Sequence, residues 1–174
     1  MQPIGPLMHE HRLIERMIRI IEAEVGRIEQ GQRPDSVLVD QAVDFFRTYA
    51  DRLHHGKEED ILFRELAKKP LLPEEKRILE ELVEEHKRGR KLVRTIHETN
   101  AAVARCENPV AVSDLTPLLR ELIGFYPVHI AKEDKQFFFP VMKHFTRQEM
   151  NAMLAEFEDF EAKLIHLKYA AIVE

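Results

Sequence analysis

The sequence predicts an all-α protein: an up-and-down antiparallel four-helix bundle with an additional C-terminal helix. Apolar residues recur at spacings of three and four over long stretches, and no extended run alternates as a strand would. Of the 174 residues, 44% are hydrophobic and 33% charged, a composition typical of a water-soluble, helix-rich protein. We expect a single domain over residues 1–174, with the bundle at about 6–143 and the last helix at about 146–170.

The charge and the apolar runs exclude several classes of protein. The net charge is -5 and no basic stripe is interleaved with aromatic residues, so we expect no nucleic-acid partner. No window approaches 18 uninterrupted apolar residues, and the first residues lack the pattern of a signal peptide, so we expect no membrane partner. A single cysteine, Cys106, excludes an internal disulfide. The expected location is cytoplasmic, and the oligomeric state stays open.

The first two helices are predicted at residues 6–30 and from Asp35 or Ser36 to about Lys68. Gly31 follows the last periodic residue of the first helix as a stop signal, and Asp35 or Ser36 is a suitable N-cap for the second. The inward stripe of the first helix includes one histidine: Leu7, His11, Ile14, Ile18, Ile21, Val25 and Ile28. The stripe of the second ends in a histidine and a glutamate: Val39, Val43, Phe46, Ala50, His54, Glu58 and Ile61.

The third predicted helix begins at Pro73, where a missing N–H costs little, and ends near Cys106. Its inward residues are Leu79, Leu82, His86, Gly89, Val93 and Ile96. A fourth helix is predicted after Ser113 or Asp114, with Leu118, Leu122, Phe125, His129 and Glu133 facing inward.

Two local signals concern the last helices. Pro127 should kink the fourth helix or loosen its hydrogen bonding, because proline has no N–H to donate. Thr146 with Glu149 is a capping-box pattern that should begin the fifth helix, which we expect to lie across the bundle.

One stretch occurs twice, 75 positions apart. HHGKEEDILF at 54–63 returns as HIAKEDKQFF at 129–138, so His54 and Glu58 correspond to His129 and Glu133. The same offset carries the stretch around His11 onto the stretch around His86. Because residues four apart share one face of a helix, each half presents a histidine and a His-x-x-x-Glu pair toward the core.

This pattern predicts a metal site with two related halves. Burying two unpaired carboxylates would cost several kcal/mol each without a cation, so an ordinary core is the weaker interpretation. Imidazole and carboxylate donors suit Fe, Mn, Zn or Co. We expect two ions, each held by two imidazoles and bridged by Glu58 and Glu133, with open positions for water, oxo, hydroxo or a small diatomic ligand. The predicted ligands are His11, His54, Glu58, His86, His129 and Glu133.

Several neighbours of these ligands admit two interpretations. His55 and Glu59 also form a His-x-x-x-Glu pair, but the second repeat has Ile130 in place of His55, which favours His54. Glu15 is either an extra ligand or, as we prefer, the partner of Arg90 in an ion pair beside the site.

Other neighbours are expected to act from outside the ligand set or not at all. Tyr126 either donates a hydrogen bond to a bound oxygen species or packs with its hydroxyl elsewhere. Gly89, which corresponds to Ile14, either leaves room near the ions or marks loose packing. We expect the remaining polar candidates at the surface: His9, His97, His144, His166, Lys57 and Lys132.

These motifs resemble the hemerythrin-like family, also called the HHE cation-binding domain. The resemblance covers roughly residues 7–143 and rests on the order His, His-x-x-x-Glu, His, His-x-x-x-Glu. It implies a four-helix bundle around two iron ions in a non-haem, oxo- or hydroxo-bridged centre, with Mn or Zn as other metals. Members of the family bind or sense dioxygen, handle nitric oxide or peroxide, sense iron, or take part in repair of iron–sulfur centres.

The sequence departs from the oxygen-carrying hemerythrins. Those proteins have His-x-x-x-His on the third helix, whereas here the second position is Arg90, so the chain is similar to a more symmetric, four-His branch. The carriers also have their fourth-helix carboxylate one residue further on, as Asp. We therefore expect binding or sensing of O2, NO or iron status rather than oxygen transport. The alternatives are an enzyme acting on peroxide or nitric oxide or in iron–sulfur repair, and a module that metal merely stabilises; whether the chain is an enzyme stays open.

Overall fold

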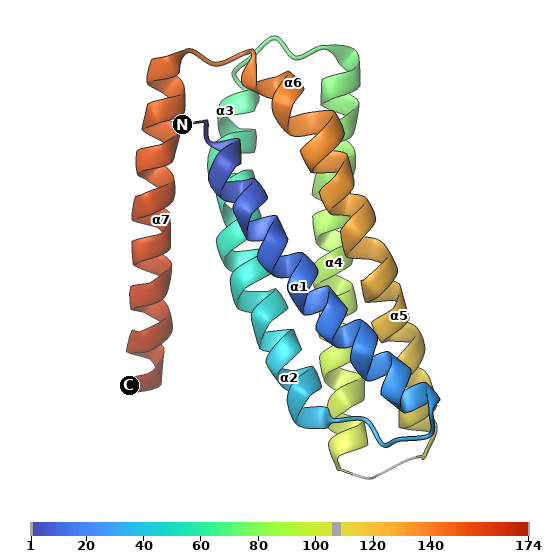
Figure 1. Cartoon of the computed structure of the whole chain (residues 1–174). Coiled ribbons are helices and arrows are strands. Elements are labelled where there is room, and N and C mark those ends of the chain that lie inside the picture. Colours follow the sequence, from blue (N-terminus) through green and yellow to red (C-terminus); the bar gives the residue numbers. More distant parts are fainter. Residues whose placement is uncertain (1, 106–108, 174) are drawn as a thin grey trace.

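The computed structural model describes residues 2–105 and 109–173, and every regular element in these ranges is helical. The elements from α1 to α6 form four helical rods. Each rod runs antiparallel to its neighbours along one axis, as Figure 1 shows. The first rod is α1 (Ile4–Glu29) and the third is α4 (Pro73–Ala104). The second rod consists of α2 (Ser36–Phe45), η1 (Phe46–His55), η2 (Glu58–Phe63) and α3 (Arg64–Leu66). The fourth consists of α5 (Pro109–Lys132), η3 (Glu133–Phe137) and α6 (Phe138–Met142), and α7 (Arg147–Val173) follows.

The rods form a square in which chain neighbours are spatial neighbours. Helix α1 packs against the second rod and α5, and α4 packs against the second rod and α5, so α1 and α4 are diagonal. This arrangement confirms the predicted up-and-down bundle. No described helix combines the length and apolar character needed to cross a membrane.

Most helix ends follow the local signals in the sequence. Asp35 caps α2 by accepting hydrogen bonds from the backbone N–H groups of the second and third residues after it, each at 3.1 Å. Gly31 has φ 85° after the end of α1, a conformation that glycine adopts without strain. Thr146 and Glu149 form the expected capping box, in which the Thr146 backbone N–H donates to the Glu149 carboxylate at 2.8 Å.

The start of the fourth rod differs from its prediction. Helix α5 begins at Pro109, so Ser113 and Asp114 lie inside the helix and do not cap it. The predicted end of the third helix near Cys106 falls at the edge of residues 106–108, which lie outside the described residues. Helix α5 also continues through Pro127, and the change in hydrogen bonding occurs afterwards, at the π-helical segment η3.

The π-helical segments distinguish the second and fourth rods from regular α-helices. In η1, η2 and η3 the wider i to i+5 hydrogen bonding changes which side chains face inward. Together these three segments carry His54, His55, Glu58 and Glu133. Wide turns of this kind are frequent at functional sites.

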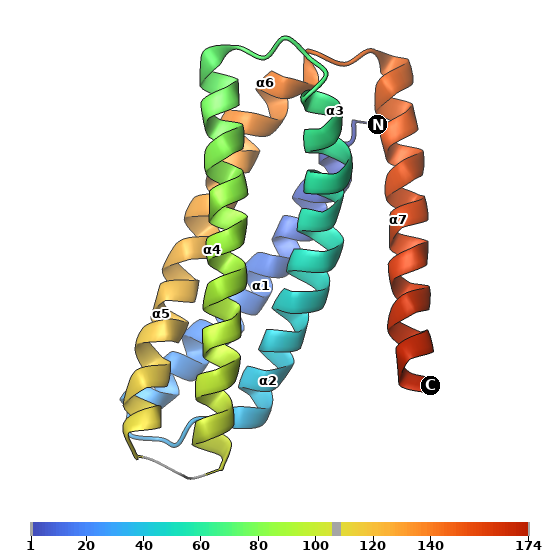
Figure 2. The same cartoon turned by 180° about the vertical axis from the view of Figure 1, so that it is seen from behind.

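Helix α7 runs lengthwise beside the second rod instead of across the bundle, as Figures 1 and 2 both show. It packs against η1 and η2. Gly56, between these segments, allows this approach: a Cβ atom there would lie 2.6 Å from Cζ of Phe160. The expected crossing is wrong because the amphipathic pattern of a helix specifies a buried face but no direction on the bundle surface.

The core is divided into two apolar clusters by a polar layer. One cluster, around Phe46, Leu119 and Leu122, fills the half of the bundle that holds α2. The other, around Leu7, Phe137 and Phe138, fills the half that holds α6. The histidines and glutamates of the repeated motif lie between them and are buried.

Candidate metal centre

The six predicted ligands all lie in the polar layer, each 0–2% exposed. Four of them form one compact group: His11, His54, Glu58 and Glu133 each offer a ligand atom within 4.8 Å of the others. His86 and His129 belong to a second group with the same spacing. The rods thus bring together side chains from four separate parts of the chain.

The two glutamates lie between the two groups and reach both. Glu58 places Oε1 3.5 Å from Nε2 of His54 and Oε2 3.4 Å from Nε2 of His86. Glu133 places Oε2 3.1 Å from Nε2 of His11, and its Oε1 lies 3.6 Å from His86 and 3.4 Å from His129. Each carboxylate therefore directs one oxygen toward each group, which is the arrangement that a bridging carboxylate requires.

Each of the four predicted imidazoles contacts a carboxylate through Nδ1, while Nε2 faces the centre. The Nδ1 distances are 2.9 Å for His54 to Glu10, 2.8 Å for His129 to Glu85, 2.7 Å for His11 to Asp134 and 2.6 Å for His86 to Glu59. These carboxylates obey the 75-residue repeat, since Glu10 corresponds to Glu85 and Glu59 to Asp134. A carboxylate on one ring nitrogen orients the other nitrogen toward a metal, and such partners are a regular feature of metal sites.

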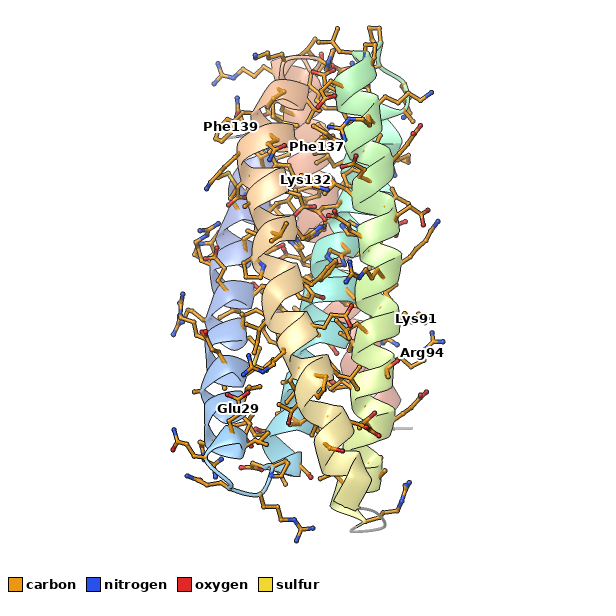
Figure 3. All side chains as sticks on the ribbon, turned by 90° about the vertical axis from the view of Figure 1, so that its right-hand side faces the viewer. Glu29, Lys91, Arg94, Lys132, Phe137 and Phe139 are labelled. Carbon is orange, nitrogen blue, oxygen red and sulfur yellow. The ribbon has the colours of Figure 1, made fainter. Side chains whose placement is uncertain are left out.

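A lysine extends two of these contacts. The Lys57 ammonium donates to Glu10 and to Glu161 of α7, and Lys132 donates to Glu85 and, at 3.0 Å, to Glu81. Lys132 is labelled in Figure 3, which views the bundle from the side of α4 and α5. The prediction that Lys57 is solvated is wrong, because α7 covers it and leaves its side chain 0% exposed.

Most of the atoms facing the centre lack hydrogen-bond partners in the described part of the chain. Nε2 of His86, Nε2 of His129 and all four carboxylate oxygens of Glu58 and Glu133 are buried without a hydrogen bond. Leaving several buried polar atoms unsatisfied is costly, so such groups call for an explanation. Neutral imidazole nitrogens and carboxylate oxygens are donors that fit Fe, Mn or Zn, and a cation here would satisfy these atoms together.

The pKa values of the centre follow from burial and close charges. Burial and the neighbouring Glu133 raise the pKa of Glu58 well above its ordinary value. Burial also opposes ionisation of Glu133, but His129 and His11 hold its pKa well below the usual range. Burial lowers the pKa of His54 to about 4. For His11, burial is outweighed by Asp134 and Glu133, which raise its pKa to about 9.

The structure adds a histidine that the repeat argument set aside. His55 is 2% exposed, and one of its ring nitrogens lies within 4.8 Å of ligand atoms of His86 and His129. Its ring stacks on that of His86 with centroids 3.8 Å apart. The four-imidazole site expected from Arg90 is thus joined by a fifth imidazole from the second rod. The two adjacent histidines in HHGKEED were the sequence signal for this additional residue. In a regular α-helix, however, adjacent residues lie on different faces, so only one of them was expected to face the centre.

The predicted pair of Glu15 and Arg90 does not form. Glu15 contacts Arg12 at 3.1 Å, whereas Arg90 donates to Asp51 at 2.7 Å and to Glu59 at 2.6 Å. The reason is the square arrangement: α1 and α4 are diagonal, and Arg90 faces η1. Glu15 also joins neither group of candidate ligands among the described residues. Arg90 remains next to the centre through Glu59, the carboxylate that holds His86.

The other neighbours divide between the surface and the interior. Tyr126 is 2% exposed, and its ring lies edge-on to His129 with centroids 6.4 Å apart; burial raises its pKa above the ordinary value. His9 and His166 are exposed as expected. His144 is not a surface residue, since it is half-buried and lies 2.7 Å from Glu75.

Comparison with known proteins identifies the family. The profile of the Hemerythrin HHE cation binding domain matches residues 2–138 and, a second time, residues 77–173. The second match starts 75 residues after the first (77 − 2), the same offset as the repeat, so two registers of the chain fit the family pattern. No curated protein and no solved structure shows a significant match to the chain. A family match over most of the chain, together with buried His and Glu groups able to hold metal, shows that this protein belongs to the hemerythrin HHE cation-binding domain family.

Proposed function

We propose that this protein binds two iron ions at the candidate metal centre and responds there to a small ligand such as O2 or NO. His11 and His54 would hold one ion, and His86 and His129 the other, with His55 as a third imidazole on the second ion. Glu58 and Glu133 would bridge the two. Mn and Zn suit the same donors. We propose iron because of the family membership as well as the ligand chemistry.

The observation that carries this proposal is the set of buried atoms without partners at one point between the rods. Four imidazoles have Nδ1 fixed by carboxylates, and the glutamate oxygens between them make no hydrogen bond to described residues. Without a cation, this set would combine desolvated polar atoms with two facing carboxylates. With a cation bound, the same atoms would become its ligands, and the carboxylates on Nδ1 already orient the imidazoles.

Burial of the centre limits what can reach it. The six predicted ligands are 0–2% exposed, so a diatomic molecule or a peroxide is of a suitable size and a large substrate is not. A bound di-iron centre would supply the capacity to coordinate and exchange electrons with such a ligand. The chain's own side chains would hold the ions, balance their charge and keep bulk water away.

Metal content tests the proposal directly. Protein expressed in iron-rich medium should contain about two irons per chain by elemental analysis, with an optical spectrum that changes on exposure to air or NO. His54→Ala should lose metal and melt at a lower temperature, while His97→Ala, a histidine away from the centre, should retain both. Full metal retention and unchanged melting in His54→Ala would contradict the ligand assignment. Zinc with no response to O2 or NO would contradict the proposed ligand response and leave metal binding in place.

A second candidate function is an enzyme that reduces peroxide or nitric oxide. It is favoured by a cavity of about 200 Å³ that borders His55 and Tyr126, because the cavity offers an approach to one side of the centre. Turnover with hydrogen peroxide or nitric oxide that disappears in Glu133→Ala would support this candidate, and binding of the ligand without turnover would exclude it.

A further inference from the structure

The cavity beside His55 has an unusual concentration of positive charge. It lies between η1 and α4 and is lined by four arginines, Arg47, Arg52, Arg90 and Arg94, and by one acidic residue, Asp51. The charged lining residues therefore sum to about +3 (four minus one), in a chain whose net charge is -5. Such a local reversal of sign attracts anions.

Most of this charge is available to a ligand. Arg90 is engaged by Asp51 and Glu59, at 2.7 and 2.6 Å. Within the described residues, no ion pair involves Arg47, Arg52 or Arg94, although elsewhere on the bundle exposed arginines such as Arg77 and Arg64 have glutamate partners. In Figure 3 the Arg94 side chain extends from α4 on the side away from α5. Guanidinium groups are suited to oxyanions because their N–H donors match two oxygens at once.

The inner wall of the cavity holds a polar side chain that the bundle leaves unsatisfied. His55 lines the cavity, is 2% exposed, and neither of its ring nitrogens has a hydrogen-bond partner among the described residues. Its Nδ1 lies 3.5 Å from Oδ1 of Asp51, at the limit of a hydrogen bond. A buried imidazole in this condition indicates a missing partner, on the metal side, the cavity side or both.

The residues that make this cavity polar are only partly repeated in the other half of the chain. Shifting four of the cavity residues by 75 positions replaces polar or small side chains by apolar ones: Arg47 by Leu122, Arg52 by Pro127, His55 by Ile130 and Gly89 by Ile14. The two arginines of α4 meet charged residues instead, Glu15 for Arg90 and Arg19 for Arg94. Of the apolar replacements, Leu122, Ile130 and Ile14 are buried. At the positions equivalent to Arg47, His55 and Gly89, the other half therefore has hydrophobic packing. Gly89 also lines the cavity, and a Cβ there would lie 3.3 Å from the Phe125 ring, a tight contact, and 3.6 Å from the Tyr126 hydroxyl oxygen.

We propose that the cavity between η1 and α4 is a binding site for a small oxyanion, held by Arg47, Arg52 and Arg94 beside the His55 face of the metal centre. Its volume of about 200 Å³ is below the range of pockets that enclose drug-sized molecules, so the ligand is a compact anion rather than a nucleotide or a peptide. The site needs no bound metal for its charge, and it would place an anionic ligand next to one ion only.

Inorganic phosphate is a suitable probe, measured by isothermal titration calorimetry on the metal-loaded protein at low ionic strength, where screening is weak. The test variant is Arg47→Gln/Arg94→Gln, which removes two exposed cavity charges. The control is Arg16→Gln/Arg19→Gln on α1, which removes the same net charge outside the cavity and includes Arg19, the repeat counterpart of Arg94. We expect the cavity variant to bind phosphate about ten-fold more weakly or worse, the control to bind as the unmodified protein does, and both to keep their metal content and melting temperature.

Three results would overturn the proposal. Equal weakening in both double variants would mean that phosphate responds only to net charge. Undiminished binding in the cavity variant that disappears on metal removal would mean that the ions alone hold the anion. Absence of binding to the unmodified protein at millimolar phosphate would remove the site while the measured metal content leaves the proposed function standing. Arginine-dependent phosphate binding by protein that contains no metal after expression in iron-rich medium would support this site and contradict only the metal proposal.

Discussion

The Nε2 atoms of His11 and His54 lie 2.9 Å apart, although the residues are 43 positions apart in the chain. Metal–imidazole distances are about 2.0–2.1 Å, so two such ligands at a right angle on one ion have nitrogens roughly 3 Å apart. The opposite ring nitrogens are held by Asp134 and Glu10. Hydrogen bonds outside the centre therefore set the spacing of this pair of candidate ligands.

Replacing His55 by leucine should have opposite effects on the two forms of the protein. In metal-free protein the change removes a buried imidazole without partners, and we expect the free energy of unfolding to rise by about 1–2 kcal/mol. In metal-loaded protein it removes a proposed ligand, so metal affinity should fall. Urea unfolding with and without chelator, together with metal analysis, checks both signs. A His55→Leu protein with unchanged metal affinity would show that this residue is no ligand.

Glu10→Gln and Glu85→Gln test the outer carboxylates in the two halves. Each removes the charge behind one imidazole, of His54 or His129, and should weaken metal binding by about 10–100-fold. The cost in stability should differ, because Lys57 is fully buried while Lys132 is 18% exposed. Glu10→Gln should lower the free energy of unfolding by roughly 1.5–3 kcal/mol, and Glu85→Gln by less than about 1 kcal/mol. Competition with a metal indicator and urea unfolding provide the two measurements; equal stability losses would contradict the unequal burial of the lysines.

Gly56→Ala should loosen the docking of α7 on the second rod. A methyl group there would lie 2.6 Å from the Phe160 ring, and overpacking of this kind costs about 1–3 kcal/mol, against a gain of about 1 kcal/mol in helix propensity. In a Phe160→Ala background the same change should stabilise, because the conflicting ring is gone. Gly124→Ala is the control, since nothing lies within 4 Å of its Cβ position. Thermal unfolding of the four proteins of the cycle and of the control measures the effect, and additive changes would disprove the contact.

Glu149→Gln should destabilise the protein in a pH-dependent way. Lys69 and the Thr146 capping contacts lower the pKa of Glu149 to about 2 from its ordinary value of 4.5. Because the folded pKa is the lower one, this carboxylate stabilises the fold above about pH 4.5, and the contribution is lost as the pH falls through 2. The variant should therefore be less stable than the unmodified protein at pH 7 and equal to it near pH 2. Chemical unfolding across this range is the measurement, with Glu158→Gln, another exposed glutamate of α7, as the control; a difference independent of pH would rule out the ionic contribution.

Helix positions and the inward faces of His11, His54, His86 and His129 could be predicted because they depend on local periodicity. Apolar spacing, the Asp35 and Thr146 caps and the Pro73 start act within a few residues of themselves, and the structure confirms all three helix starts. The 75-residue repeat also indicated which residues are equivalent in the two halves of the chain. The carboxylates that bind Nδ1 of the imidazoles follow the same repeat. Only the structure, however, shows that each of them contacts an imidazole: Glu10, Glu59, Glu85 and Asp134.

The remaining features depend on how the rods pack. Sequence symmetry favoured His54 over His55 as the ligand, but the wide turns of η1 bury His55 beside His54. No local sequence pattern predicts where a helix will widen in this way. Arg90 pairs with Asp51 rather than Glu15 because α1 and α4 lie on a diagonal, a relationship that exists only once four rods are assembled.

Residue type and spacing along one chain were therefore enough to predict the family, the helices and the two-fold pattern of candidate ligands. The packing of the helices was needed to show that Lys57 is buried under α7, that a fifth imidazole lies at the centre, and that arginines line a cavity between η1 and α4. These depend on distances between segments that are remote in the chain, and periodicity along a single helix contains no information about them.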